Sequence, residues 1–221
     1  MPKLKMPKNS PELDMTPMVD LAFLLVTFFM LTAQFRAEEP VVVTIPSSIK
    51  EIPKPDKDIL TVTVDSVGRV FFDIDNKMIR AEMLKMVGAK HDITFSEEEV
   101  HRFSLMQSFG VPITEMKKLI IADERDRMEI NKTTKGIPVD SANAATNELK
   151  DWINYARLAS AQFYQKQGLT EPKEYNKLRC AIKGDGRSNY SAVKEVIGTF
   201  QHPDIKINRF NLLTSLEGKP E

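Results

Sequence analysis

The stretch Asp14-Met15-Thr16-Pro17-Met18-Val19-Asp20 opens an uncharged and mostly apolar run that continues from Leu21 to Ala33. A helix made of this run alone is roughly 20 Å long at 1.5 Å per residue, whereas the hydrocarbon core of a bilayer is about 30 Å thick. A helix that crosses the membrane must therefore include residues on both sides of the run. We predict a single transmembrane helix over residues 14–36, preceded by a cytoplasmic tail over residues 1–13.

Asp20 lies about one turn or more inside the membrane in such a helix. A carboxylate at that depth costs a few kcal/mol, so it is normally retained for a function. Thr16, Asp20, Thr27 and Gln34 are spaced by four, seven and seven residues, which places them along one helical face. A polar stripe on an otherwise apolar helix indicates a face turned toward a protein partner or a water path.

Two other interpretations of this segment remain open. A cleaved signal peptide has an apolar core of similar length, but its cleavage site requires small residues at −3 and −1. Ala33 and Ala37 have Leu31 and Phe35 at −3. Alternatively, Asp20 belongs to the first turn of the helix, where the helix dipole and interfacial water stabilise its charge and no further function is needed.

The distribution of charge orients the predicted helix. Three lysines precede it and Arg36 follows it, so the positive-inside rule places the N-terminus in the cytoplasm and the bulk of the chain on the other side. The whole chain has 31 basic and 31 acidic residues, and this balance gives no reason to expect a nucleic-acid partner. The single cysteine, Cys180, excludes an internal disulfide.

The residues after the membrane helix predict a soluble α+β domain. Residues 37–58 place prolines among Ser, Lys, Glu and Asp, which is typical of an extended linker. Alternating side chains then predict a hairpin of strands at 59–64 and 70–74. A closing strand, helix and strand are expected at residues 179–183, 191–200 and 206–213. We predict that these parts share one mixed sheet in a domain over residues 59–221.

A helical insertion, over about residues 88–176, is predicted between the hairpin and the closing unit. Ser96 and Glu99 form a capping-box pattern for a helix that ends near Gly110. Two further helices are expected at 113–122 and 142–167, the second of them capped by Ser141. A charged, turn-rich stretch at 123–140 is expected between them. The second helix carries an apolar stripe that we assign to the core: Leu149, Trp152, Ile153, Ala156, Ala159 and Phe163.

The segment from Asp14 to Asp20, with the apolar run after it, resembles the ExbD/TolR family. There an Asn/Asp-x-Thr-Pro-hydrophobic-hydrophobic-Asp stretch opens the single membrane helix. Residues 40–48 are similar to the extended stretch that follows this helix in the family. Lys183-Gly184-Asp185 stands where an Arg-Ala-Asp type turn is common. The resemblance covers about residues 12–75 and 178–215, and the long middle part departs from the family's usual short form.

The resemblance implies a single-pass motor subunit in the inner membrane of a Gram-negative bacterium, with its folded domain in the periplasm. Family members form dimers inside a ring of a larger multi-helix subunit of the ExbB/TolQ type. They pass motion to a TonB- or TolA-like protein that reaches the outer membrane.

In that comparison Asp20 is the proton-carrying residue of a motor driven by the proton-motive force. Asp14, Thr16 and Thr27 are its supporting polar residues, and Asp14 lies at the cytoplasmic edge. Because the pattern is closer to ExbD than to TolR, we expect the motor to power outer-membrane transport. A TolR-like envelope or motility motor is the alternative.

Partner binding is expected at the open edges of a short mixed sheet, where a second copy or a TonB-like peptide could add a strand. The candidate residues are Val41, Val43, Ile45, Ile207 and Phe210.

The sequence contains no pattern that indicates catalysis. The three histidines show no metal-ligand spacing, and no Ser, His and Asp set suggests a nucleophile. We therefore expect no enzymatic activity, no metal and no cofactor. The remaining alternative is a non-energised, membrane-anchored periplasmic binding module, in which Asp20 only starts the helix.

Overall fold

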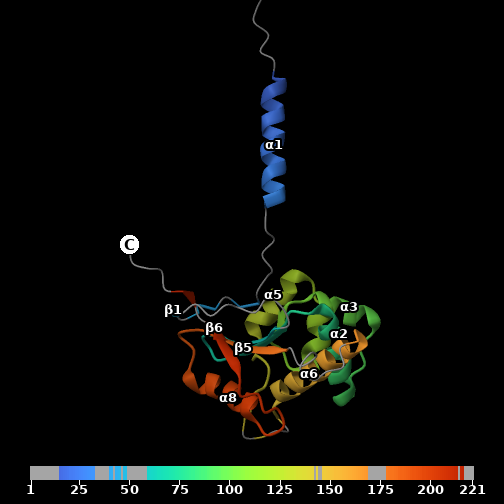
Figure 1. Cartoon of the computed structure of the whole chain (residues 1–221), viewed down its shortest axis with the longest axis vertical. Helices are drawn as coiled ribbons and strands as arrows, with labels where there is room; N and C mark the ends of the chain where they lie inside the picture. The colour runs from blue at the N-terminus through green and yellow to red at the C-terminus, as the bar shows by residue number, and fades with distance from the viewer. Residues whose placement is uncertain are drawn as a thin grey trace, which may run out of the picture. The chain divides into compact units, whose positions relative to one another are not determined.

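The computed structural model describes residues 15–32, 40–41, 43–45, 47–48, 59–141, 143, 146–168, 178–213 and 215–216. The chain divides into two compact units, Met1–Ala37 and Glu38–Glu221. The described part of the first unit is one helix, and that of the second is an α+β domain (Figure 1).

The helix of the first unit is α1, Thr16–Thr32. Its 17 residues correspond to about 26 Å at 1.5 Å per residue. None of its side chains is buried. Within the described part of the chain, no helix has both the length and the apolar character needed to cross a membrane.

A mixed five-stranded sheet, with the order β4-β3-β2-β5-β6, organises the second unit (Figure 1). Its strands are β2 (Ile59–Val64), β3 (Val70–Ile74), β4 (Ser108–Phe109), β5 (Arg179–Gly184) and β6 (Phe210–Leu213). The central strand β2 is antiparallel to β3 and parallel to β5, while β5 is parallel to β6 and β3 is antiparallel to β4. The predicted mixed sheet is confirmed, and β2 joins the hairpin to the closing unit.

The alternation of side chains along β2 decides which face of the sheet is buried. Val62 is paired with Phe72 of β3 and Ile182 of β5, and all three are fully buried. Thr61 and Thr63, on the opposite face, are only half-buried. Because successive side chains point to opposite faces, a one-residue slip of β2 would exchange these two sets.

Most of the domain's helices pack into the same hydrophobic core as the sheet. The helices are α2 (Lys77–Lys90), α3 (Glu97–Leu105), η1 (Ile113–Glu115), α4 (Met116–Ile121), α5 (Glu124–Thr133), α6 (Glu148–Lys166) and α8 (Tyr190–Gln201). Helix α2 packs against α6 and α3. The core assignment of the α6 stripe is confirmed, since five of its members are fully buried and Phe163 packs against the core.

Four aromatic rings join the insertion to the sheet. Phe72 comes from β3, Phe103 from α3, Phe109 from β4 and Trp152 from α6. The ring centroids of Phe109 and Trp152 are 4.7 Å apart in an edge-to-face arrangement, and those of Phe103 and Phe109 are 5.2 Å apart. Such pairs contribute about 0.5–1.5 kcal/mol beyond the burial of their area. The insertion therefore completes the core of the domain and is not a separate module.

The prediction for the insertion, helices separated by a turn-rich stretch, is wrong at two places. The Ser96–Glu99 capping box is present, but its helix ends at Leu105, and Ser108–Phe109 pairs with β3 as a strand. The stretch predicted to be turn-rich contains α5, whose first turn is acidic and therefore suits the helix dipole.

Two predicted boundaries also differ from the structure. Helix α6 begins at Glu148, because the side chain of Asn147, not Ser141, caps it by accepting the Lys150 N–H at 3.0 Å. Strand β6 begins at Phe210, because Lys206 has a φ of 53° and interrupts the extended backbone expected from that residue onward.

We expect Gly110→Ala to lower the free energy of unfolding by about 1–3 kcal/mol, a usual cost of overpacking a core. A Cβ at Gly110 would lie 2.2 Å from Cδ1 of Phe71, which is only 1% exposed. Urea unfolding followed by circular dichroism measures the change. Gly184→Ala is the matched control, since the nearest atom to its Cβ would be Cγ2 of Val193 at 4.0 Å. Equal losses in the two variants would contradict the close packing at Gly110.

Candidate functional site

Asp20 lies in the second turn of α1. The helix begins at Thr16, and its first turn contains no acidic residue. The helical hydrogen bonds are already established there, since the Val19 N–H donates to the Met15 carbonyl at 3.0 Å. The stabilisation of a negative charge by the helix dipole falls off within the first turn. The interpretation of Asp20 as a first-turn residue is therefore not supported by the structure.

The structure brings Thr16 and Asp20 together on one side of α1, where they line a shallow depression with Phe23. Thr27 follows about two turns later, and its hydroxyl donates to the Leu24 carbonyl at 2.9 Å. Because that hydroxyl is satisfied within the helix, Thr27 can face an apolar surrounding at little cost. Asp14 and Gln34 lie outside the described residues.

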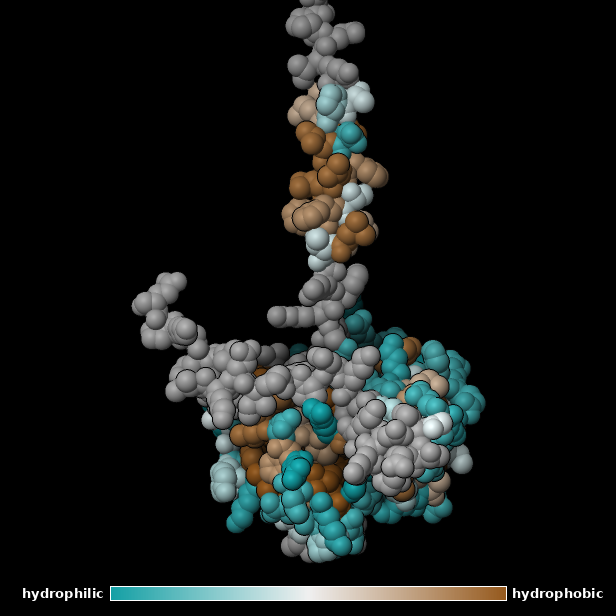
Figure 2. Space-filling model, in the orientation of Figure 1, coloured by the Kyte–Doolittle hydropathy of each residue, from teal (hydrophilic) through white to brown (hydrophobic). Residues whose placement is uncertain are grey.

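The rest of α1 is an apolar surface, seen as the mostly brown helix in Figure 2. All its large hydrophobic side chains from Met18 to Leu31 are more than half exposed, and Leu31 reaches 87%. Asp20 is the only charged residue of the helix. Monomeric soluble proteins rarely expose contiguous apolar patches of more than a few hundred Å². This surface therefore needs lipid or another protein to cover it.

A second candidate region lies where the stretch after the first unit meets the folded domain. The Thr44 N–H donates to Oδ2 of Asp185 at 3.1 Å, and the Gly186 N–H donates to the Thr44 carbonyl at 2.9 Å. Asp185 also accepts the Arg187 N–H at 2.9 Å, and its side chain is only 1% exposed. Hydrogen bonds from the Arg187 backbone and side chain, and from Thr44, hold the pKa of Asp185 below its usual value. Asp185 is thus held as a carboxylate that ties residue 44 to the domain.

The residues predicted to bind a partner differ in accessibility. Val43 is buried, whereas Val41, Ile45, Ile207 and Phe210 are half-buried. The ring of Phe210 stacks on that of Phe200, which belongs to the core, and the two ring centroids are 5.9 Å apart.

Strand β6 lies at one end of the sheet order. The chain beyond β6 returns to the stretch that includes Thr44, because β1 (Ser47–Ser48) pairs in parallel with β7 (Ser215–Leu216). Ser47–Ser48, which follows the candidate residues 41, 43 and 45, therefore lies beside Ser215–Leu216, which follows the candidate residues 207 and 210.

Asp65 was not predicted from the sequence; it directly follows β2, as Asp185 directly follows the parallel strand β5. The Asp65 carboxylate accepts the Arg69 N–H at 2.8 Å and the Arg69 Nε at 2.6 Å, and it is 2% exposed. The signal in the sequence is an aspartate just after a strand with an arginine a few residues later, four in the case of Asp65 and Arg69 and two in the case of Asp185 and Arg187. Parallel neighbours place both turns at the same edge of the sheet.

The described residues contain no group of three or more side chains that could hold a metal ion. His91 Nε2 lies 3.3 Å from Asp151, and His202 Nδ1 lies 3.5 Å from Asp204. Each of these carboxylates also pairs with a lysine, so the histidines belong to small clusters of charge.

We expect Asp185→Ala to speed hydrogen exchange at the Thr44 amide, because the variant removes the acceptor of that N–H. In the unmodified chain the pKa of Asp185 is lower when folded than when unfolded. The charged carboxylate therefore stabilises the contact at any pH above the pKa of an unfolded aspartate. The contact is therefore present at neutral pH and is lost only as the pH falls below about 3.9. Exchange measured by NMR checks both points. Glu195→Ala, which removes the acceptor of the Ser141 N–H instead, is the control. Unchanged protection of Thr44 in Asp185→Ala would contradict the contact.

The sequence matches a family model described as Biopolymer transport protein ExbD/TolR over residues 6–217. The match confirms the resemblance seen in the sequence and extends it across the inserted part of the domain. No curated protein and no solved structure gives a significant match to the chain.

Proposed function

The chain belongs to the ExbD/TolR family, and on that basis we propose that it is the proton-carrying subunit of an inner-membrane motor driven by the proton-motive force. Members of this family generally work with a multi-helix subunit of the ExbB/TolQ type and with a TonB- or TolA-like protein. The observation that carries the proposal is Asp20, the only charge on α1, placed in the second turn among exposed apolar side chains.

Residues 14–36 form the proposed membrane anchor of this subunit. The described helix supplies about 26 Å, and a few flanking residues complete the roughly 30 Å of a hydrocarbon core. The lysines before it favour a cytoplasmic N-terminus. The domain over residues 59–221 is then periplasmic in a Gram-negative bacterium, joined to the anchor by the linker over residues 37–58.

Asp20 alternates between two protonation states in the proposed mechanism. The charged carboxylate needs water or a polar group of the surrounding subunit, whereas the neutral form can face apolar side chains. Thr16, in the same depression, supplies a hydroxyl beside it, and Asp14 positions the entry at the cytoplasmic edge. The membrane potential supplies about 2.3 kcal/mol per charge per 100 mV. Exchange between the two environments thereby couples proton flow to movement of α1.

The folded domain passes this movement to partners in the periplasm. Strand β6 ends the sheet, and its outer edge is the proposed place for a second copy of the chain or for a strand of a TonB-like protein. Phe210 and Ile207, both half-buried, flank that edge. We propose that the motor powers outer-membrane transport. We also propose that the chain is not an enzyme and binds no cofactor.

We expect Asp20→Asn to reduce activity that depends on the proton-motive force to the level of cells without the protein. The amide keeps the size of the side chain but cannot take up and release a proton at physiological pH. Thr32→Val, at the other end of the same helix, is the control, because the Thr32 hydroxyl is satisfied by the Phe28 carbonyl at 2.8 Å and has no part in the proposed proton transfer. Uptake assays in cells, with co-purification of the larger membrane subunit, measure activity and assembly together. Full activity of an assembled Asp20→Asn complex would instead favour an anchored binding module.

A further inference from the structure

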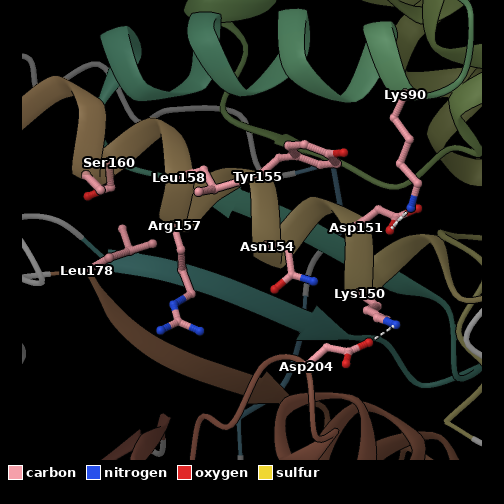
Figure 3. Close-up of a pocket in the computed structure, with 11 residues that line it drawn as sticks. Lys90, Lys150, Asp151, Asn154, Tyr155, Arg157, Leu158, Ser160, Leu178 and Asp204 are labelled. Atoms are coloured by element: carbon pink, nitrogen blue, oxygen red, sulfur yellow. Dashed lines mark hydrogen bonds and ion pairs between the residues drawn. The ribbon is translucent and has the colours of Figure 1, made fainter.

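Two adjoining cavities lie between α6 and the start of β5, and they share Arg157 and Leu178 in their walls. The first has a volume of about 650 Å³ and follows α6 (Figure 3). The second has a volume of about 1010 Å³ and follows the chain that enters β5 and β6. Ligand cavities are typically about 300–1,000 Å³, so the space suits a small molecule.

The second cavity is lined by four cations and, among its described lining residues, by no carboxylate. The cations are Arg157, Arg179, Lys206 and Arg209. None of the four forms an ion pair within 4.0 Å with a carboxylate of the described residues. The whole chain has equal numbers of basic and acidic residues, so this concentration of charge is local. A cavity lined by one sign of charge attracts ligands of the opposite sign.

The fold itself brings these cations together. Because β5 and β6 are parallel, their first residues share one edge of the sheet, where Arg179 starts β5 and Arg209 precedes β6. The left-handed backbone of Lys206, with a φ of 53°, turns the chain just before β6. Arg157 joins them from α6, which belongs to the inserted part of the domain.

Arg157 is held in place without being neutralised. Its Nη1 donates to the Ile205 carbonyl at 2.6 Å, and its other N–H groups have no hydrogen bond to a described residue. Figure 3 shows the side chain leaving α6 on the side where Leu178 and Asp204 lie. A guanidinium fixed at one nitrogen retains N–H groups in a planar array that can bind a carboxylate or a phosphate.

The first cavity adds apolar surface and an unpartnered hydroxyl. Its two lysines are neutralised by ion pairs with Asp151 and Asp204. Leu158 and Leu178 add apolar side chains to the wall of the cavity near Arg157 (Figure 3). Ser160 lines the same cavity, is 2% exposed, and its Oγ has no hydrogen-bond partner among the described residues. Buried hydroxyls usually have a partner, and this one lies without any in the wall of the cavity.

We propose that the two cavities together bind a small organic phosphate, that is, a phosphate monoester carried on an apolar body. The phosphate lies among Arg157, Arg179 and Arg209, where several unneutralised cations favour a doubly charged group over a singly charged one. The apolar body lies along Leu158 and Leu178, within reach of Ser160. Such a ligand connects α6 to the strands β5 and β6, so its binding gives the inserted part of the domain a function separate from proton transfer at Asp20.

The test uses the full chain in nanodiscs of phosphatidylcholine and titrates 2-naphthyl phosphate by calorimetry. We expect saturable binding, with 2-naphthol and 2-naphthoate bound at least about tenfold more weakly because each lacks the double charge. Binding should also weaken as salt is added. Absence of binding, or equal affinity for 2-naphthol and 2-naphthyl phosphate, would overturn the proposal.

Variants locate the site. Arg157→Gln should weaken binding of 2-naphthyl phosphate by about tenfold or more. The double variant Arg179→Gln/Arg209→Gln should weaken binding by the same amount. Both of its side chains are exposed, so it tests the site even if Arg157→Gln destabilises the fold by removing the hydrogen bond to Ile205. Arg102→Gln, an exposed arginine paired with Glu98 on α3, should leave affinity unchanged. Unchanged affinity in the folded double variant would overturn the proposed site.

A further comparison identifies the source of the phosphate. If the natural ligand is a lipid headgroup, nanodiscs that contain phosphatidic acid should compete with 2-naphthyl phosphate. If it is a soluble ester, affinity should be the same in the two kinds of nanodisc once the ionic strength is matched. Either result supports the phosphate site, provided that the arginine variants remove the binding.

Discussion

A charged carboxylate at Asp20 needs water or a polar group beside it. The large side chains of α1 around it are apolar and do not supply one. This constraint links the chemistry of one residue to the position of a whole helix. In the proposed membrane setting, taking up or releasing a proton changes which surroundings the helix face can occupy. The remaining faces of α1 are apolar, and contiguous apolar surfaces of this kind are typical of sites that lipid or another protein covers.

Strand pairing and side-chain packing hold the parts of the folded domain together. Strand β2 lies at the centre of the sheet and pairs with both the hairpin and the closing unit. The aromatic rings of Phe103, Phe109 and Trp152 fasten the inserted part to the same core. The contact between Thr44 and Asp185 attaches the preceding stretch to the end of β5. In the proposed motor, movement of Thr44 would therefore reach the turn that follows a paired strand.

Local sequence patterns predicted the elements whose stability is mainly local. Alternation along Ile59–Val64 and the capping box at Ser96 depend on neighbours a few residues away, and both are present. Strand β4 could not be predicted, because its two residues extend only by pairing with Phe72 and Asp73.

Helix α5 was missed for a related reason. It has little apolar surface, and its C-terminal carbonyls at Asn131 and Lys132 are satisfied by Arg69, which lies far away in the sequence. The position of Asp20 within an apolar helix could be predicted, because it depends only on the order of residues along α1. The cations around Arg157 come from α6, β5 and the chain before β6, and only the parallel pairing of strands brings them together.

Infrared difference spectroscopy of the assembled complex detects directly whether Asp20 takes up and releases a proton. Aspartate labelled with ¹³C at the side-chain carboxyl identifies the band of a protonated carboxyl group as the proton-motive force is applied and removed. If Asp20 carries the proton, we expect a band that changes with the proton-motive force and is lost in Asp20→Asn. A complex that turns over with no such band, or with a band that persists in Asp20→Asn, would contradict proton transfer at Asp20.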